Sequence, residues 1–386
     1  MAADFYDFSE RINNLQQNNL YRNRLTHEGP QSIHVQIGAQ RLLNFCSNDY
    51  LGLACHPALT TALKAGADHY GVGGGASHLL SGHTSAHQQL EEELAEFTGR
   101  DKALLFSTGY MANLGVISAL LQRGDLVLQD RLNHASLIDG AILARARIMR
   151  YAHQDLMDLR NKLANCQNRA LIVSDTIFSM DGDIADVPAL AILAQQYRAG
   201  LLLDDAHGFG VLGERGAGSL EHFGLSQQQA PLLMATLGKA CGGFGAFVAG
   251  PAELIDVLLQ SARTYIYTTA MPSAMAEANR AAIRVVQTES WRRQHLQTMI
   301  QRFRLGAGQL SLPIMDSNTA IQPLLIGGSE QVLAVSKRLF EKGFWVGGIR
   351  PPTVPANTGR LRISLSANHQ AEHIDALLSA LAEVLT

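Results

Sequence analysis

The strongest constraint on the fold of this 386-residue chain is an alternation of short apolar runs with helix-length segments across its middle. Six such runs lie at residues 103–107, 126–129, 170–174, 201–203, 232–236 and 246–249. Segments with helical spacing, such as 111–122 and 187–197, separate several of them. Buried apolar strands that alternate with helices are typical of an α/β fold with a mostly parallel central sheet. Ligands bind at the carboxyl ends of such strands, so the polar residues that follow these runs are the first candidates for chemistry.

The two flanks of the chain predict an N-terminal segment and a smaller C-terminal domain. Spaced apolar residues predict an amphipathic helix over 7–24, whereas the glycine-rich stretch 71–82 is too flexible for a helix or a central strand. Beyond Pro272 the pattern predicts helices over 273–289, 292–310, 329–342 and 371–384, and strands over 320–325 and 361–366. We expect an N-terminal segment over 1–45, a large domain over 46–275 and a small α/β domain over 276–386.

Composition and charge exclude several classes of protein. Hydrophobic residues make up 47% of the chain, which is enough for a large buried core. The 31 basic and 34 acidic residues leave a net charge of −3, so the overall charge does not attract nucleic acid or an anionic membrane. The four cysteines are widely spaced, and the sequence has neither a signal-like start nor an apolar run long enough to span a membrane. We therefore expect a protein of the reducing cytoplasm.

A lysine follows one predicted strand directly. Lys239 lies in the segment TLGKACGGFG at 236–245, where small residues leave room for a flat ligand. Burial of an ammonium group is costly and lowers its pKa, which makes the amine available to form a Schiff base. The alternative is a strand-end lysine that reaches solvent, and this motif alone does not decide between the two.

An aspartate and a histidine follow another predicted strand, in the segment LLLDDAHG at 201–208. A carboxylate at Asp204 can keep a pyridine nitrogen protonated, so that the ring accepts carbanion electrons, and His207 can bind a phenolic oxygen on the same ring. Strand-end aspartates also serve as helix N-caps and metal ligands. The glycines at 208, 210 and 213 match G-x-G-x-x-G, but no helix pattern follows them, so a dinucleotide site is the weaker interpretation.

Two other strand ends carry candidate binding groups. Small residues at 107–109 open a predicted helix, whose free N–H groups and dipole suit a phosphate near Gly109 and Tyr110. An ordinary strand–helix turn has the same appearance. His134 follows the next strand and can stack on a cofactor ring, although a single histidine is more often structural.

A pair of histidines has the spacing of a helical metal site. His83 and His87 stand four residues apart, with Glu91 one turn further. The sequence has no H-E-x-x-H motif, and Gly82 makes a helix at His83 doubtful. We therefore expect no metal ion.

Taken together, these motifs resemble the fold-type-I pyridoxal-phosphate enzymes, and among them the α-oxoamine synthase family. The resemblance rests on the glycine-rich stretch before 81–82 and on the segments FCSNDYLGL at 45–53, LNHAS at 132–136, FSMDGD at 178–183, DDAHG at 204–208, TLGK at 236–239 and YTT at 267–269. These segments follow the family's order over essentially the whole chain. Cys241 and Asp175 depart from the family's usual residues, which puts the cofactor environment and the rate in doubt.

The resemblance implies a role for each candidate residue. Lys239 would hold pyridoxal 5'-phosphate as an imine and later move a proton, with Asp204 on the pyridine nitrogen and His134 on the ring face. The residues implied around the ring oxygen and the phosphate are Ser179, His207, Gly109, Tyr110 and Thr236, together with Thr268 and Thr269, which would reach the phosphate of a neighbouring subunit. The residues implied to bind substrate are Arg22, Asn48, His134, Arg350 and Thr353.

The implied reaction is a decarboxylative condensation of L-alanine with a pimeloyl thioester, carried by coenzyme A or an acyl carrier protein, in a homodimer. The segments IRPPTVP at 349–355 and GRLR at 359–362 look like the alanine-using branch of the family, which serves biotin biosynthesis. Two alternatives stay open: a glycine-using 2-amino-3-oxobutyrate CoA-ligase of the same family and, more remotely, a nicotinamide-dependent reductase. A non-enzymatic binding module would not need a lysine, an aspartate and histidines at separate strand ends.

Overall fold

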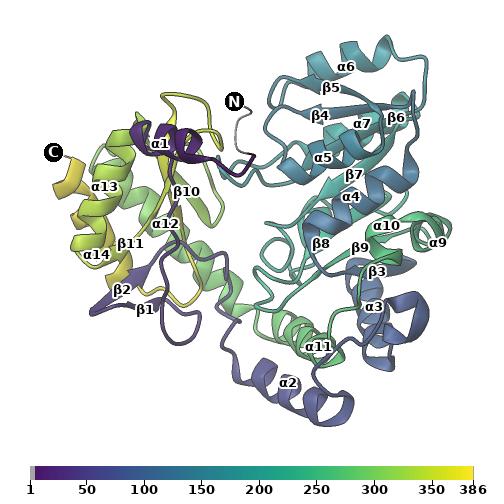
Figure 1. Cartoon of the computed structure of the whole chain (residues 1–386), viewed down its shortest axis with the longest axis horizontal. Coiled ribbons are helices and arrows are strands. Elements are labelled where there is room, and N and C mark those ends of the chain that lie inside the picture. Colours follow the sequence, from purple (N-terminus) through teal and green to yellow (C-terminus); the bar gives the residue numbers. More distant parts are fainter. Residues whose placement is uncertain (1–4, 386) are drawn as a thin grey trace. The chain divides into compact units, whose positions relative to one another are not determined.

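A computed structural model describes residues 5–385, which divide into two compact units (Figure 1). Unit 1 holds the chain up to residue 48, residues 180–182 and the chain from 295 onward, and unit 2 holds 49–179 and 183–294. These limits differ from the predicted ones at 45/46 and 275/276. Helix α11 (Ser273–Thr288) packs against α2 (Pro57–Tyr70) and α3 (Ser85–Thr98), and therefore belongs to unit 2. The first four residues of the predicted N-terminal segment lie outside the described residues.

Unit 2 is built on a seven-stranded, mostly parallel sheet, which confirms the predicted fold class. In spatial order its strands are β3 (Lys102–Phe106), β9 (Ala246–Gly250), β8 (Leu232–Thr236), β7 (Gly200–Asp204), β6 (Ala170–Asp175), β4 (Leu126–Asp130) and β5 (Arg147–Tyr151). Only β9 runs antiparallel to its neighbours. Strand β5 was not predicted, because its sequence RIMRY carries two arginines and lies at the sheet edge.

Helices cover both faces of this sheet because its strands are apolar on both sides. On β4, Val127 belongs to one apolar cluster, and Leu126 and Leu128 belong to the other. The helices of the first cluster are α4 (Gly109–Leu120), α5 (Ala135–Leu143), α9 (Ala252–Ser261) and α10 (Arg263–Ile266). The helices of the second cluster are α6 (Leu156–Ala164), α7 (Val187–Gln196) and α8 (Ser219–His222).

The glycine-rich stretch contains one helical turn, so the prediction of no helix was wrong for its last five residues. They form the π-helical turn η1 (His78–Gly82), closed by a hydrogen bond from Gly82 N to Ser77 O at 3.0 Å. A Cβ at Gly82 would lie 2.1 Å from the Ala76 carbonyl oxygen, so only glycine allows this closure. Helix α3 then runs from Ser85 to Thr98, and Gly99 caps it with a left-handed φ of 65°.

Unit 1 contains two small sheets and most of the remaining helices. One sheet pairs β1 (His34–Ile37), β2 (Gln40–Asn44) and β11 (Phe344–Trp345), and the other pairs β10 (Ile321–Gly327), β13 (Gly359–Ser364) and β12 (Gly347–Ile349). The helices are α1 (Ser9–Gln17), α13 (Ser329–Glu341), α14 (Ala371–Leu385) and, from residue 295 onward, α12 (Trp291–Gln309). Helix α1 ends well before the predicted residue 24, because Asn19 turns the backbone to a φ of 56°.

Within residues 5–385, no helix combines the length and the apolar character needed to cross a bilayer.

Candidate active site

The strand ends of the central sheet bring the predicted chemical groups of unit 2 to one edge. Lys239 follows β8, His207 follows β7, Ser179 follows β6 and His134 follows β4. These four strands are mutually parallel, so their carboxyl ends lie at the same edge. The structure therefore assembles residues that the sequence spreads over more than a hundred positions.

The amine of Lys239 contacts a histidine. Lys239 is half-buried in the loop between β8 and β9, and its Nζ lies 2.8 Å from Nε2 of His207. The loop folds tightly because Gly243 N donates to the Leu237 carbonyl at 2.9 Å, and Gly242 adopts a φ of +64°. A Cβ at Gly242 would lie 2.3 Å from Ala54 N, which explains why the loop after the lysine is rich in glycine.

A tyrosine that the sequence analysis gave no role completes this contact. The hydroxyl of Tyr50 lies 2.7 Å from Nδ1 of His207, and its side chain is 1% exposed. Tyr50, His207 and Lys239 therefore form one hydrogen-bonded row that fixes the imidazole between a phenol and an amine. The only sequence signal for Tyr50 was its place in the segment 45–53.

Asp204 is a buried carboxylate without a cationic partner. It is 3% exposed, accepts a hydrogen bond from Asn113 Nδ2 at 2.7 Å, and accepts another from Ala206 N at 3.0 Å. In the described part of the chain, no lysine, arginine or histidine forms a salt bridge with it. Asn113, which the sequence analysis missed, also binds Ser136 at 2.9 Å. A buried negative charge of this kind suits a ligand that brings its own N–H⁺ group.

His134 and Asp175 lie beside this carboxylate. His134 is the N-cap of α5, its backbone N donates to Asp175 Oδ2 at 2.7 Å, and its Nδ1 lies 2.8 Å from Ser136 Oγ. Burial lowers the pKa of His134, so the ring is neutral and offers a flat face. Burial and the neighbouring Asp204 raise the pKa of Asp175 well above its usual range.

The start of α4 provides an anion-binding position. Thr108 caps this 12-residue helix by accepting a hydrogen bond from Met111 N at 3.2 Å, and Gly109 and Tyr110 form its first turn. The helix dipole and the unpaired N–H groups of a first turn favour a phosphate. The Tyr110 hydroxyl donates to Asp139, and the Thr236 hydroxyl donates to the Gly245 carbonyl at 3.0 Å.

The remaining predicted residues of unit 2 lie in loops. Ser179 is half-buried directly after Phe178. Thr268 is half-buried and Thr269 is exposed, and an isolated β-bridge pairs Thr269 with Ser77 of the glycine-rich stretch. A role of these threonines toward a neighbouring subunit stays a prediction.

Apart from His134, the residues predicted to bind substrate belong to unit 1, where three of them form one group. Arg22 donates to the Thr353 hydroxyl at 3.2 Å, and Arg350 donates to the Tyr21 carbonyl at 2.7 Å. Burial and the charge of Arg22 lower the pKa of Arg350. Asn48 is separate from this group and accepts a hydrogen bond from Arg362 at 3.0 Å.

The dinucleotide motif has no structural support. Residues 208–213 form turns, and the next helix is the four-residue α8, so no long helix follows the glycines. The structure thus removes the pattern on which a nicotinamide-dependent reductase would rest.

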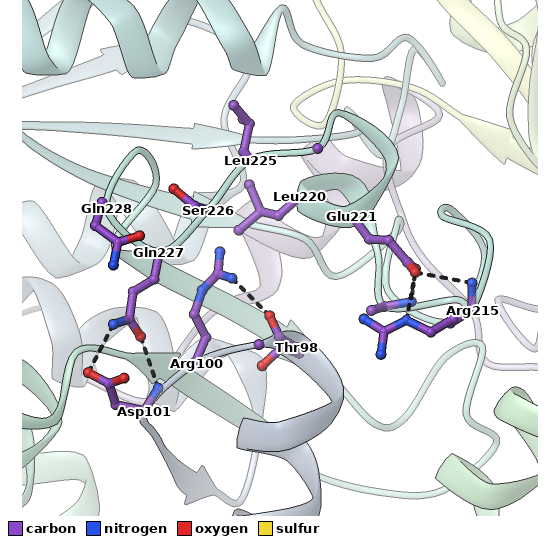
Figure 2. A pocket seen from close by; sticks show the side chains of 13 residues that line it. Thr98, Arg100, Asp101, Arg215, Leu220, Glu221, Leu225, Ser226, Gln227 and Gln228 are labelled. Atoms are coloured by element: carbon purple, nitrogen blue, oxygen red, sulfur yellow. Dashed lines mark hydrogen bonds and ion pairs between the residues drawn. The ribbon is translucent and has the colours of Figure 1, made fainter.

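A cavity of about 430 Å³ lies elsewhere in unit 2 and contains none of the predicted site residues. Figure 2 shows its polar side chains bound to one another: Arg100 donates to the Thr98 carbonyl, Gln227 binds Asp101, and Arg215 binds Glu221.

Comparisons with known proteins show what the whole chain is similar to. A family model described as aminotransferase class I and II matches residues 40–381. The 8-amino-7-oxononanoate synthase of Thioalkalivibrio sulfidiphilus is 57% identical over 377 residues, which are 97% of this chain and 96% of that protein. A structure of SPT with its PLP internal aldimine has a TM-score of 0.93 at 28% identity, over 98% of this chain and 97% of that one. A crystal structure of 8-amino-7-oxononanoate synthase from Francisella tularensis has a TM-score of 0.79 at 31% identity, over 89% and 98%.

Proposed function

The chain belongs to the 8-amino-7-oxononanoate synthases, α-oxoamine synthases within the class I and II aminotransferase family, and from this premise we propose how its residues carry out the reaction. It is a pyridoxal-phosphate-dependent acyltransferase of biotin biosynthesis. Its proposed substrates are L-alanine and a pimeloyl thioester, which condense with loss of carbon dioxide and release of the thiol carrier. The proposed location is the cytoplasm.

Pyridoxal phosphate supplies an electron sink for a carbanion at the substrate's α-carbon. The residues at the sheet edge fit this group. Asp204 offers the pyridine nitrogen a buried carboxylate that forms no salt bridge within residues 5–385, the neutral ring of His134 offers a flat surface, and the first turn of α4 offers N–H groups for the phosphate. Lys239 would hold the carbonyl carbon of the group.

Lys239 and His207 carry the proton chemistry in this proposal. The contact of 2.8 Å between Lys239 Nζ and His207 Nε2 keeps the amine in one orientation, and Tyr50 keeps the imidazole in place from its other side. A positioned amine can take a proton from the substrate's α-carbon and return it later. This contact, at the same sheet edge as a buried and cation-free Asp204, is the observation that carries the proposal.

Arg22 and Arg350 are proposed to bind a substrate carboxylate. Both guanidinium groups bind neutral oxygens, and neither forms a salt bridge with any residue from 5 to 385. The Arg350 Nε is buried without a hydrogen-bond partner. Two unneutralised cations beside the Thr353 hydroxyl are the donors that a carboxylate needs for charge-assisted hydrogen bonds.

A homodimer is proposed from the apolar surface around the predicted phosphate-binding threonines. Tyr267, Val72 and Leu80 are 71%, 82% and 82% exposed. The bridge between Ser77 and Thr269 links the two segments that carry them. Large exposed apolar side chains in adjacent segments favour an interface, and a second copy of this chain would cover them.

The proposed reaction is tested with a panel of amino acids and acyl thioesters. Purified holoenzyme receives L-alanine, glycine or L-serine together with pimeloyl or acetyl thioesters, carried by coenzyme A or by acyl carrier protein, and thiol release is measured. We expect the highest kcat/KM for L-alanine with a pimeloyl thioester. Equal or greater kcat/KM for glycine with acetyl-CoA would overturn the substrate proposal and favour the glycine-using relatives, whereas the chemistry assigned to Lys239 would stand.

A further inference from the structure

Three histidines outside the site described above converge at the start of α3. His78 begins the π-helical turn η1, His83 follows that turn, and His87 lies in the first turn of α3. One nitrogen of each ring lies within 4.8 Å of the other two. The sequence spacing had indicated His83, His87 and Glu91, but Glu91 instead accepts a hydrogen bond from Leu105 N at 2.9 Å. His78 takes its place because η1 turns the chain back on itself.

The three nitrogens are close to the spacing that a tetrahedral ion requires. Zinc–nitrogen bonds of about 2.0–2.1 Å in a tetrahedron place neighbouring ligand nitrogens about 3.3 Å apart. His78 Nδ1 and His83 Nδ1 are 2.9 Å apart, so this pair needs to open by a few tenths of an ångström. His87 needs to approach by about 1.5 Å at most, because no pair exceeds 4.8 Å.

The surroundings already orient two of the rings. His87 Nε2 lies 2.7 Å from the Met271 carbonyl oxygen, which can only accept, so Nε2 carries the hydrogen and Nδ1 carries the lone pair. His78 stacks on Tyr265 with ring centroids 4.9 Å apart and an interplanar angle of 13°. A histidine whose second nitrogen donates to a backbone carbonyl is the usual arrangement around a metal-binding imidazole.

Each nitrogen has a present contact that an ion would replace. His78 and His83 share one hydrogen bond, His87 Nδ1 accepts from Thr84 N at 3.1 Å, and the Thr84 hydroxyl lies 3.0 Å from the same nitrogen. For a bound ion to form three metal–nitrogen bonds, the ring that donates in the His78–His83 contact would carry its hydrogen on Nε2 instead of Nδ1, and the helix cap at His87 would open. His83 is half-buried.

The donor set selects the class of ion. Three imidazoles without a carboxylate suit zinc and neighbouring transition metals, whereas magnesium and calcium prefer oxygen ligands. We propose that His78, His83 and His87 form a binding site for one divalent transition-metal ion of the zinc class. The bound ion would hold η1 and the start of α3 together. These segments already contact Met271 through His87 Nε2 and Thr269 through its bridge with Ser77. This site goes beyond the family's reaction and does not depend on it.

The experiment measures metal binding by the tag-free holoenzyme after treatment with a chelator and removal of the chelator. Zinc is titrated by calorimetry, and cobalt is titrated by the difference spectrum, since tetrahedral cobalt has visible absorption bands. We expect one ion per chain with micromolar or tighter affinity, no competition from magnesium, and a zinc-dependent rise in the unfolding temperature. Cofactor absorbance is recorded separately. A failure to bind zinc is therefore distinguishable from a failure of the proposed reaction.

The decisive variant is His83→Gln, since His83 is half-buried and its replacement leaves the His87 cap intact. The matched control is His69→Gln, at an exposed histidine of α2. His83→Gln and His78→Asn should each weaken zinc binding by at least about 100-fold, and His69→Gln should bind zinc like the wild type. Absence of stoichiometric zinc binding in the wild type would overturn the proposal, and so would wild-type affinity in a folded His83→Gln variant.

Discussion

Hydrogen bonds link Tyr50 to His207 and His207 to Lys239. We therefore predict that the phenol of Tyr50, which was not among the predicted site residues, controls the orientation of the reactive amine of Lys239. The change Tyr50→Phe removes one oxygen and keeps the ring that fills the core. It leaves Nδ1 of His207 without the partner that now lies 2.7 Å away. Since Tyr50 is 1% and His207 is 7% exposed, water does not replace that partner easily. An unsatisfied buried polar group costs about 1–3 kcal/mol.

This cost sets the expected size of the effect on the rate. If the imidazole loses its orientation toward Lys239 Nζ, this free-energy cost adds to the activation free energy. About 1.4 kcal/mol of activation free energy corresponds to a tenfold change in rate. We therefore expect kcat to fall by about 5- to 150-fold, with a small change in KM. Steady-state thiol release by the holoenzyme, with absorbance to confirm full cofactor loading, measures this effect.

The control is Tyr151→Phe, the same change at a tyrosine that is 2% exposed in strand β5. Urea unfolding should show a loss of stability of about 1 kcal/mol or more for both variants, because each loses a buried hydroxyl. Only Tyr50→Phe should lower kcat. A folded Tyr50→Phe enzyme with kcat within twofold of the wild type would show that Tyr50 does not position His207 for catalysis.

Three further predictions follow from the same structure. Asp204→Asn should slow exchange of the α-proton of L-alanine by at least about 100-fold while the cofactor stays bound to its lysine, which proton NMR in D2O measures. Arg350→Ala should raise the KM of one substrate by about tenfold or more with unchanged cofactor absorbance, and an unchanged KM would remove this residue from substrate binding. Burial would lower the pKa of His153, but hydrogen bonds with Asp130 and Asp183 raise it to about 10. The stabilisation from this raised pKa is complete below about pH 6.5 and is lost as the pH rises through 10, so His153→Gln should flatten the fall in Tm between neutral pH and pH 10.

The central sheet was predictable because its strands are buried on both faces and therefore apolar throughout. The runs before Lys239 and Asp204 are of this kind, and parallel strands place the residues after them at one edge. Strand β5 was missed because RIMRY carries the charges that an edge strand tolerates. Helix α1 was predicted too long because periodicity does not show that Asn19 reverses the backbone.

The unpredicted site residues share one property: their partners are distant in sequence or lie across an irregular turn. Tyr50 meets His207 from 157 positions away, and Asn113 meets Asp204 from 91. No periodic pattern encodes such pairs, since the tertiary fold alone creates them. His78 was overlooked because glycine-rich segments predict irregular chain, whereas a π-helical turn returns this residue to His83.

The central claim is that Lys239 holds the cofactor, and reduction with borohydride followed by peptide mapping tests it most directly. Reduction converts an imine into a stable secondary amine, so mass spectrometry locates the lysine that carried it. The account predicts a reduced pyridoxyl group on the peptide that contains Lys239. It predicts the same label in Lys102→Ala, where the replaced lysine binds Asp256 at 2.8 Å, and no label in Lys239→Ala. A label on any other lysine of the wild type, or a label that persists in Lys239→Ala, would contradict the account.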